Sequence, residues 1–450
     1  MSTTNIITDS ESVCPPEYTA RLDVRTKFGL AMLLSVLWFA LTTWIALPWM
    51  RDLAALTNWP VAILVVGGIA LVPGLMNAFL AASLLLDRRP ARCSFATYPA
   101  VSILIAAYDE QQLILKTLQS IARQNYPGEF EVLVIDDGST DETAAVVERM
   151  TAPWLRLLRQ TTNLGKSAAL NRGLAEARFD LIITLDADSS LHIDALCNLV
   201  ERYLSDPPGT KAVAGMMLVG NSRVNWVTKA QEWDYFHGIA AVKRMQSFFH
   251  GTLVAQGAFS LYERGALEEV GGWDDCVGED IVLTWAMLAR GWRIGHAEDA
   301  CCFTSAPDRL RTFVHQRRRW ARGMMEAFRR HPRILLVPRM STFFVCWNLL
   351  FPWLDFAYTA AFIPGVVLAL FGIFWVAGPM TLALLPMALL MNVLMYRISV
   401  TMFDAQGLRV RRNVAGFLMY VFGYSLILQP VSVAGYVSEI LGLRKNWGTK

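Results

Sequence analysis

The 450-residue sequence predicts a cytosolic α/β domain flanked by transmembrane α-helices. In the middle of the chain, short apolar strands alternate with helical stretches, which is the pattern of βαβ units. On both sides of that region lie apolar segments long enough to cross a bilayer. Hydrophobic residues make up 54% of the chain and charged residues 18%. Because soluble globular chains are less apolar, the composition also favours membrane-embedded ends around an ordinary middle.

The N-terminal part predicts a helical hairpin in the membrane. After a cytosolic tail at 1–27, two transmembrane helices are expected within 28–90, at 29–50 and 61–86. Each has about the 20 residues that span a bilayer core. Basic residues flank the hairpin on both sides: Arg21, Arg25, Lys27, Arg88, Arg89 and Arg92. By the positive-inside bias, both flanks face the cytosol, and so does the domain that follows.

The predicted cytosolic domain covers 97–340. Its expected strands are residues 101–107, 130–135, 155–158, 181–185 and 212–216. A mostly parallel sheet follows from their alternation with helices, and such sheets bind ligands at the carboxyl ends of the strands. The acidic sequences Tyr108-Asp109, Asp136-Asp137 and Asp186-Ala187-Asp188 all fall there.

The C-terminal part predicts two to three transmembrane helices within 341–442, followed by a tail at 443–450. Apolar segments occur at 343–374, 380–396 and 416–440. The first contains Pro352, Asp355 and Pro364, and it is either an interfacial helix followed by a span or one kinked helix. Asp355 faces a polar cavity or lies at the interface beside a helix break. The basic tail favours an even number of spans, whereas the apolar segments number five.

Charge and cysteine content exclude some classes of protein. The net charge of +3, with no basic tail of the kind that binds nucleic acid, does not favour nucleic acid as a partner. The seven cysteines include no C-x-x-C spacing, so neither a zinc site nor a disulfide framework is supported, and we expect reduced thiols.

Carboxylates at the first two strand ends predict a nucleotide site. Asp109, Glu110, Asp136 and Asp137 can accept hydrogen bonds from a uracil N–H or from ribose hydroxyls. Lys166, which opens a helix, can reach a phosphate. The alternative is that residues 136–141 form only a turn and a helix cap, and that the lysine is merely solvated.

Asp186 and Asp188 predict a divalent cation site. Alternate residues after a strand point the same way, so both carboxylates can share one ion, Mg²⁺ or Mn²⁺, that carries a diphosphate. The alternative is an ordinary polar loop. Further on, Glu279 and Asp280 begin a helix, and a carboxylate there can take the proton of a sugar hydroxyl. Both acids can instead simply complement the helix dipole.

Residues 309–331 predict an amphipathic interface helix rich in arginine. Within it, Gln316, Arg319 and Trp320 form a set in which an indole can hold a sugar ring and a guanidinium can neutralise a diphosphate. Part of this helix can also lie on anionic headgroups.

Taken in order, these motifs resemble the membrane-integrated processive family-2 glycosyltransferases, which include cellulose, chitin and hyaluronan synthases. The likeness is greatest to bacterial poly-β-1,6-N-acetylglucosamine synthases. It implies a Rossmann-like GT-A domain in which Asp280 takes the position of the catalytic base in the family's T-E-D motif. Gln316, Arg319 and Trp320 match Q-x-x-R-W, and Gly257, Ala258 and Phe259 occupy the stretch that lines the acceptor site. Gly278 departs from the usual residue before Glu-Asp.

The resemblance implies a processive, inverting, metal-dependent hexosyltransferase. We expect it to polymerise a β-linked exopolysaccharide of the biofilm type from a UDP-sugar, UDP-N-acetylglucosamine first. The growing polysaccharide would cross the bacterial cytoplasmic (inner) membrane, in which the multi-pass chain sits, with a small membrane accessory subunit as a further expected partner. The alternative within the class is a non-processive transferase that adds one sugar to a lipid carrier. A transporter or receptor that only binds nucleotide is the alternative from another class.

Overall fold

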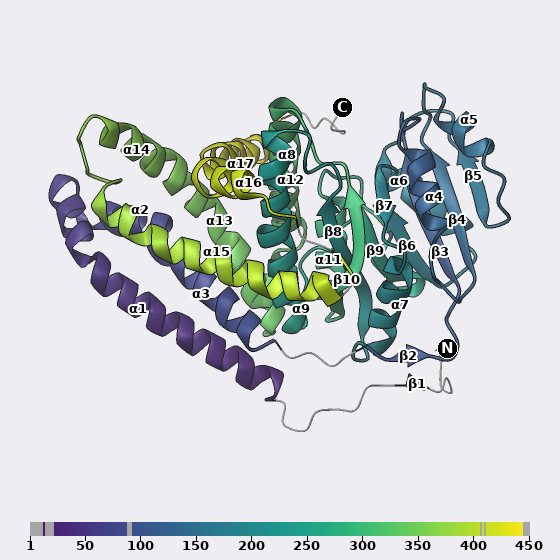
Figure 1. The fold of residues 1–450 in the computed structure, drawn as a ribbon, viewed down its shortest axis with the longest axis horizontal. Helices are drawn as coiled ribbons and strands as arrows, with labels where there is room; N and C mark the ends of the chain where they lie inside the picture. The colour runs from purple at the N-terminus through teal and green to yellow at the C-terminus, as the bar shows by residue number, and fades with distance from the viewer. Residues whose placement is uncertain (1–11, 14–21, 88–91, 406, 409–410, 444–450) are drawn as a thin grey trace. The chain divides into compact units, whose positions relative to one another are not determined.

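The computed structural model describes residues 12–13, 22–87, 92–405, 407–408 and 411–443 (Figure 1). The chain divides into two compact units. The first comprises Met1–Ala20, Arg89–Gly220 and His250–Ser305, and the second comprises Arg21–Arg88, Asn221–Phe249 and Ala306–Lys450. The first is an α/β unit and the second is helical.

The α/β unit is built on one sheet with the strand order β5-β4-β3-β6-β9-β8-β10-β7. Five strands lie where the sequence predicts them: β3 Val101–Ala107, β4 Phe130–Asp136, β5 Leu155–Arg159, β6 Leu181–Leu185 and β8 Thr210–Val219. Three were not predicted: β7 Ser189–Leu191, β9 Phe259–Glu263 and β10 Arg293–Thr304. The strands from β5 to β6 are parallel, whereas β9 runs antiparallel to both β6 and β8. The sheet is therefore mixed: the strands from β5 to β6 fit the parallel prediction, as does the pairing of β8 with β10, whereas β9 and β7 run antiparallel to their neighbours.

Six helices accompany the sheet: α4 Ile114–Ile121, α5 Thr143–Glu148, α6 Lys166–Glu176, α7 Ala195–Ser205, α10 Arg264–Val270 and α11 Glu279–Ala289. The central strands β3 and β4 are almost entirely buried, as expected for strands covered on both faces. Helix α6 packs closely at Gly173, where a Cβ would lie only 2.8 Å from Ile135. That close packing fixes the start of α6, at Lys166, near the strand ends. A separate two-stranded sheet pairs β1 Ser12–Val13 with β2 Ser94–Phe95.

The cysteines depart from the prediction at one described position. Cys197, Cys276, Cys301, Cys302 and Cys346 are free thiols, but Cys93 is disulfide-bonded. The expectation of reduced thiols is therefore wrong at Cys93. Pairing depends on which cysteines the fold brings together, and their spacing in the sequence does not reveal this.

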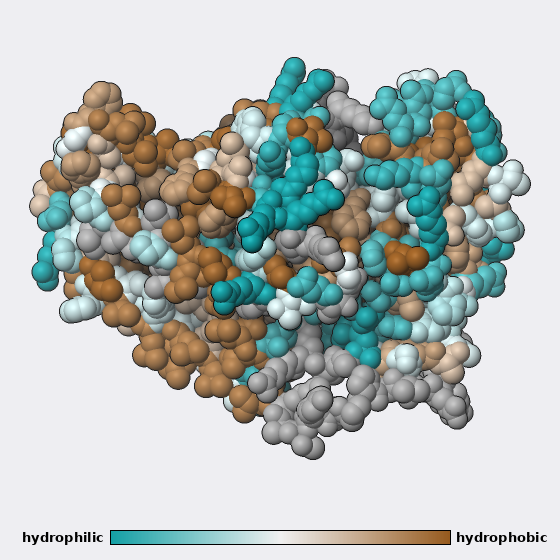
Figure 2. All heavy atoms as spheres, viewed as in Figure 1, coloured by the Kyte–Doolittle hydropathy of each residue, from teal (hydrophilic) through white to brown (hydrophobic). Residues whose placement is uncertain are grey.

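The helical unit contains long apolar helices at both ends of the chain. Within the described residues, four helices are long and apolar enough to cross a membrane: Val24–Leu56, Trp59–Leu85, Met340–Leu370 and Val414–Ile440. The first is α1 (Val24–Leu56), and Figure 2 shows apolar side chains covering the exposed surface along it. The second combines α2 Trp59–Val66, η1 Gly67–Leu71 and α3 Val72–Leu85.

The segment expected to be either kinked or split is one continuous helical run from Met340 to Leu370. It consists of α13 Met340–Ala357, η4 Tyr358–Phe362 and α14 Ile363–Leu370. Asp355 on this run accepts a hydrogen bond from the Tyr436 hydroxyl at 2.8 Å. The remaining apolar segments are helices α15 Pro379–Ala405, α16 Val414–Met419, η5 Tyr420–Tyr424 and α17 Ser425–Ile440.

The other helices of this unit come from segments that we expected inside the 97–340 domain. They are α8 Trp226–Asp234, η2 Tyr235–Ala241, α9 Val242–Phe248, α12 Leu310–Arg330 and η3 Pro332–Leu336. A buried apolar cluster joins Val227 and Ala230 of α8 to Phe313 of α12 and Tyr424 of η5. This packing explains why 221–249 and 306–340 group with the apolar helices.

Candidate active site

One edge of the α/β sheet gathers most of the predicted site residues of that unit. Strands β3, β4 and β6 are parallel, so their carboxyl ends meet at this edge. Strand β9 runs the opposite way and begins there, with Phe259 paired to Leu185. The backbone N–H of Asp186 donates to the carbonyl of Ala258 at 3.1 Å. The fold therefore joins the Asp-x-Asp sequence to the 257–259 stretch.

The loops after β3 and β4 are interlocked by hydrogen bonds. Asp109 has φ 53°, in the left-handed region, and its Oδ1 accepts from the Thr140 N–H at 2.8 Å. Its own N–H donates to Ser139 Oγ at 3.0 Å, and the Glu110 N–H donates to Thr143 Oγ1 at 2.8 Å. Residues 136–141 thus form a turn, as the alternative interpretation predicts. Its hydrogen bonds hold Asp109 and Glu110 at the same edge of the sheet.

Asp136 and Asp137 are both buried at the end of β4. Asp136 Oδ1 accepts from the Ser139 N–H at 3.1 Å. The two carboxylate oxygens of Asp137 accept from the N–H groups of Leu164 and Gly165 at 2.9 and 2.8 Å. Burial raises the pKa of Asp137 above its usual value, although these two hydrogen bonds oppose the shift. Asp137 therefore fixes the loop before Lys166, and its contact with a nucleotide stays a prediction.

Lys166 is the cation of this edge. Its Nζ lies 2.6 Å from Asp186 Oδ1 and 3.6 Å from Glu279 Oε1. Burial alone would lower the pKa of Lys166, but the two carboxylates outweigh it and raise that pKa above its usual value. A Cβ at Gly257 would lie 3.1 Å from the same Nζ. The ammonium is therefore charged and enclosed by three of the predicted positions.

Asp188 interacts with the charges of the nearby carboxylates Asp186 and Glu110. Its Oδ1 accepts from the Ser189 hydroxyl at 3.2 Å and the Thr304 hydroxyl at 3.4 Å. Burial, and then the charges of Asp186 and Glu110, raise the pKa of Asp188 to about 6. The ionised form of Asp188 is therefore disfavoured first by burial and then by the charges of Asp186 and Glu110.

This pair of carboxylates fits a divalent cation that arrives with a nucleotide. No cluster of three or more His, Cys, Asp or Glu side chains able to hold a metal occurs within the described parts of the chain. Magnesium is commonly held by one or two carboxylates, with water and substrate phosphates as the other ligands. Asp186 and Asp188 supply two such oxygen donors, and the raised pKa of Asp188 marks charge that a cation would offset. Bound there, Mg²⁺ or Mn²⁺ would neutralise a diphosphate.

Glu279 and Asp280 form the first turn of α11. Glu279 is buried and faces Lys166, whereas Asp280 is half-buried. The hydroxyl of Thr284 donates to the Asp280 carbonyl at 2.6 Å and accepts from the Ala255 N–H at 2.9 Å. Thr284 therefore fastens the start of α11 to the segment before β9. Sequence reasoning missed it, and its place one turn after Asp280 was the only signal.

The 257–259 stretch supplies backbone more than side chains. Phe259 is fully buried in the core, where its ring fills the space that a side chain at Gly215 would need. Gln256 Nε2 donates to the Gly215 carbonyl at 2.6 Å and holds the turn. The ring of Phe259 is therefore a core element, and the expected role of the 257–259 stretch at an acceptor site stays a prediction. Gly257 and Ala258 remain at the edge.

Gln316, Arg319 and Trp320 lie on α12 in the helical unit. Trp320 is 40% exposed. The Oε1 atom of Gln316 is buried and has no hydrogen-bond partner among the residues that the structure describes. Arg317, which we did not predict, is buried and lies over the Trp320 ring, 4.0 Å from its centroid. In the sequence, nothing distinguishes it from the arginines beside it.

Comparison with known proteins finds a family model that matches part of the α/β unit. Residues 102–271 match the family described as Glycosyl transferase family 2. The poly-beta-1,6-N-acetyl-D-glucosamine synthases of Staphylococcus epidermidis and Staphylococcus aureus (strain COL) are each 32% identical over 232 residues. The matched region is 51% of this chain and 56% of each relative. The chain thus spans about half the length of the curated relatives it matches.

Among solved structures, the fold is similar to that of the mannosyltransferase PcManGT from Pyrobaculum calidifontis in complex with GDP-Man and Mn2+. The TM-score is 0.58 and the identity 22%, over 88% of this chain and 99% of that one. At this level of identity the likeness concerns the fold.

Proposed function

We propose that this chain, which carries a family 2 glycosyltransferase domain of the GT-A fold among apolar membrane-type helices, polymerises a β-linked polysaccharide from a UDP-sugar. The observation that carries the proposal is the Lys166 ammonium held between Asp186 and Glu279 at the edge where the strands end. One positive charge among several carboxylates suits a diphosphate that brings its own cation.

The donor we propose is UDP-N-acetylglucosamine, because the matched relatives are synthases of poly-β-1,6-N-acetylglucosamine. The carboxylates of Asp109, Glu110 and Asp136 would bind the nucleoside, with Asp137 holding the loop before Lys166 in place. Lys166 would neutralise the diphosphate together with Mg²⁺ or Mn²⁺ on Asp186 and Asp188. The fold relative was solved with Mn2+ and a nucleotide sugar, which is consistent with a divalent cation.

The reaction we propose is a single displacement. Asp280 takes the proton from an acceptor hydroxyl, whose oxygen attacks the anomeric carbon on the face opposite the departing diphosphate. The new bond is therefore β, and UDP leaves with the electron pair of the broken bond. Glu279 keeps Lys166 charged and in place. Trp320 would stack on the acceptor sugar, and Gln316 and Arg319 would bind the diphosphate. Repeated addition and passage of the chain across the inner membrane complete the proposal.

The test is to purify the full chain in nanodiscs and measure UDP release from several sugar nucleotides, with Mg²⁺, Mn²⁺ or a chelator. UDP release from UDP-N-acetylglucosamine, with a long product that linkage-specific glycosidases degrade, is the expected result. A single sugar on an extractable lipid would instead identify the non-processive transferase. Nucleotide binding without UDP release under any condition would contradict the proposal and favour a binding protein.

A further inference from the structure

Arg317 is the most buried charged residue near the proposed acceptor-binding indole. Its side chain is 4% exposed, and its Nη2 lies 2.9 Å from Oδ2 of Asp234, the last residue of α8. The same Oδ2 accepts a hydrogen bond from the Tyr424 hydroxyl at 2.8 Å. The buried guanidinium is held in one place by its ion pair with Asp234, because moving it away would leave a buried carboxylate without its opposite charge.

The guanidinium covers one face of Trp320. Its central carbon lies 4.0 Å from the centre of the indole, closer than to Phe313 at 5.1 Å or Tyr235 at 5.8 Å. A planar guanidinium stacks on an aromatic face, and its positive charge is attracted to the ring electrons. Trp320 as a whole residue nevertheless remains 40% exposed. A ligand therefore meets Trp320 away from the covered face.

We infer that Arg317 is a positioning residue, which uses its ion pair with Asp234 to hold the Trp320 ring and leaves one face of it for the acceptor sugar. The identity of the ligand as an acceptor sugar rests on the proposed function, but the positioning of the Trp320 ring by Arg317 is independent of it. A one-sided platform fixes the orientation of the sugar that stacks on it, so the hydroxyl to be extended is presented reproducibly.

Asp234, the partner of Arg317, is closely packed against the helix that follows it. Directly after Asp234 the helix widens into the π-type turn η2, and Gly238 follows one turn on. A Cβ at Gly238 would lie 3.1 Å from Asp234 Oδ1, so the glycine leaves room for this carboxylate. Lysine at position 317 could keep the ion pair, but its compact ammonium has no plane to lay on the indole.

The experiment compares Arg317→Lys with Arg322→Lys, a matched change on the same helix. Arg322 is 6% exposed and pairs with Glu439 of α17 at 3.2 Å. The full chain is labelled with 5-fluorotryptophan, and its ¹⁹F resonance from Trp320 is identified with Trp320→Phe. We expect Arg317→Lys to shift or broaden that resonance and Arg322→Lys to leave it unchanged. Tyr424→Phe, which keeps the ion pair, should give a smaller change of the same kind.

Kinetics then tests the consequence for the acceptor. Arg317→Lys should raise the KM for an N-acetylglucosamine oligosaccharide roughly threefold to thirtyfold, with UDP release from donor alone unchanged. An unchanged Trp320 resonance in Arg317→Lys and Tyr424→Phe, or an equal change in Arg322→Lys, would overturn the inference while polymer synthesis stands. Another outcome is that the Trp320 resonance changes in Arg317→Lys while neither the parent chain nor any variant uses a sugar acceptor. In that case the positioning role of Arg317 holds and the proposed function fails.

Discussion

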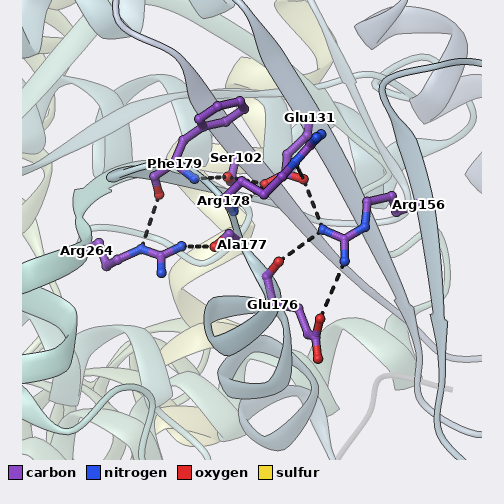
Figure 3. A network of polar contacts seen from close by, with 8 residues as sticks. All are labelled: Ser102, Glu131, Arg156, Glu176, Ala177, Arg178, Phe179 and Arg264. Carbon is purple, nitrogen blue, oxygen red and sulfur yellow. Dashed lines mark hydrogen bonds and ion pairs between the residues drawn. The ribbon is translucent and has the colours of Figure 1, made fainter.

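The buried carboxylates at the two ends of the central strands differ in their partners and in the direction of their pKa shifts. At the amino end, the fully buried Glu131 accepts hydrogen bonds from Ser102 Oγ at 2.7 Å, from the N–H and Nε of Arg178 at 2.6 and 2.8 Å, and from Arg156 Nη1 at 3.2 Å (Figure 3). Burial alone would raise the pKa of Glu131, but these donors lower it. Arg156 and Arg264 also donate to backbone carbonyls of the 176–179 turn, as Figure 3 shows.

At the carboxyl end, one ammonium contacts two carboxylates, and burial raises the pKa of a third carboxylate of the same edge. Lys166 is the cation that contacts Asp186 and Glu279, and the pKa of Asp188 is raised to about 6. A buried carboxylate whose hydrogen bonds are all made stabilises the fold. A buried carboxylate with a raised pKa can instead gain free energy when a ligand brings a cation to it. The hydrogen bonds at the amino end indicate a structural role there, whereas the buried carboxylates at the carboxyl end support the proposal that a cation-bearing ligand binds at that end.

A substitution at the carboxyl end should therefore affect chemistry much more than folding. Asp280→Asn removes the proposed base, and we expect turnover to fall by about 10² to 10⁴, the usual contribution of a positioned base. UDP binding should persist, because the carboxylates that would contact the nucleotide are intact. The measurement is UDP release beside equilibrium binding of UDP.

Asp275→Asn is the control for that experiment, since Asp275 is an exposed aspartate in the segment just before α11. It should keep the parent rate. Sustained polymer synthesis by Asp280→Asn would remove the assignment of the base.

The role proposed for Asp188 can be tested with Asp188→Asn. Because the raised pKa of Asp188 means that its ionised form destabilises the cation-free protein at pH 7, loss of this carboxylate should leave that protein at least as stable as the parent. Added Mn²⁺ and UDP should stabilise the parent by about 2.7 kcal/mol at a hundred times the Kd, and this gain should vanish in the variant. Thermal unfolding with and without the ligands measures both. An intact ligand-dependent gain would show that Asp188 does not hold the cation.

Much of the α/β fold follows from the sequence, because buried parallel strands read as apolar runs. Val101–Ala107 and Leu181–Leu185 were predicted with the bounds that the structure has. Strand β7, Ser-Ser-Leu, carries no such run, and β9 alternates with polar residues as an antiparallel strand does. Strands β7 and β9 of the mixed half were missed for that reason.

The candidate site divides in the same way. Residues attached to strand ends, such as Asp109, Asp186 and Asp188, were identified because their place follows from the strand. Arg317 and Thr284 were missed because their importance depends on neighbours distant in sequence, Asp234 and Ala255. Periodicity indicates which residues share a helix face, but it does not indicate which distant residue completes an ion pair.

At the amino end, Glu131→Gln should lower stability and spare catalysis. It replaces hydrogen bonds to charged donors, and we expect a loss of about 2 kcal/mol with kcat unchanged. The lowered pKa of Glu131 means that its contribution is present above the unfolded value, about 4.3, and is lost as the pH falls through the folded value. Stability of the variant should therefore depend less on pH in acid. Thermal unfolding from pH 3 to 7 measures this, and a fall in kcat with stability preserved would reverse the two roles.

The smallest change that should register at the carboxyl end is Gly257→Ala. The backbone of Gly257 is outside the left-handed region, so alanine fits the chain, but its Cβ would lie 3.1 Å from Lys166 Nζ and 3.5 Å from Glu279 Oε1. The ammonium must then move by a few tenths of an ångström, and we expect the donor KM to rise roughly threefold to tenfold with little change in stability. Gly265→Ala in α10 is the matched control, because its Cβ would meet only Glu263 Oε1 at 3.9 Å. Equal donor KM values in the two variants would mean that the position of Lys166 does not govern donor binding, and the contrast between the two ends of the sheet would then rest on Asp188 alone.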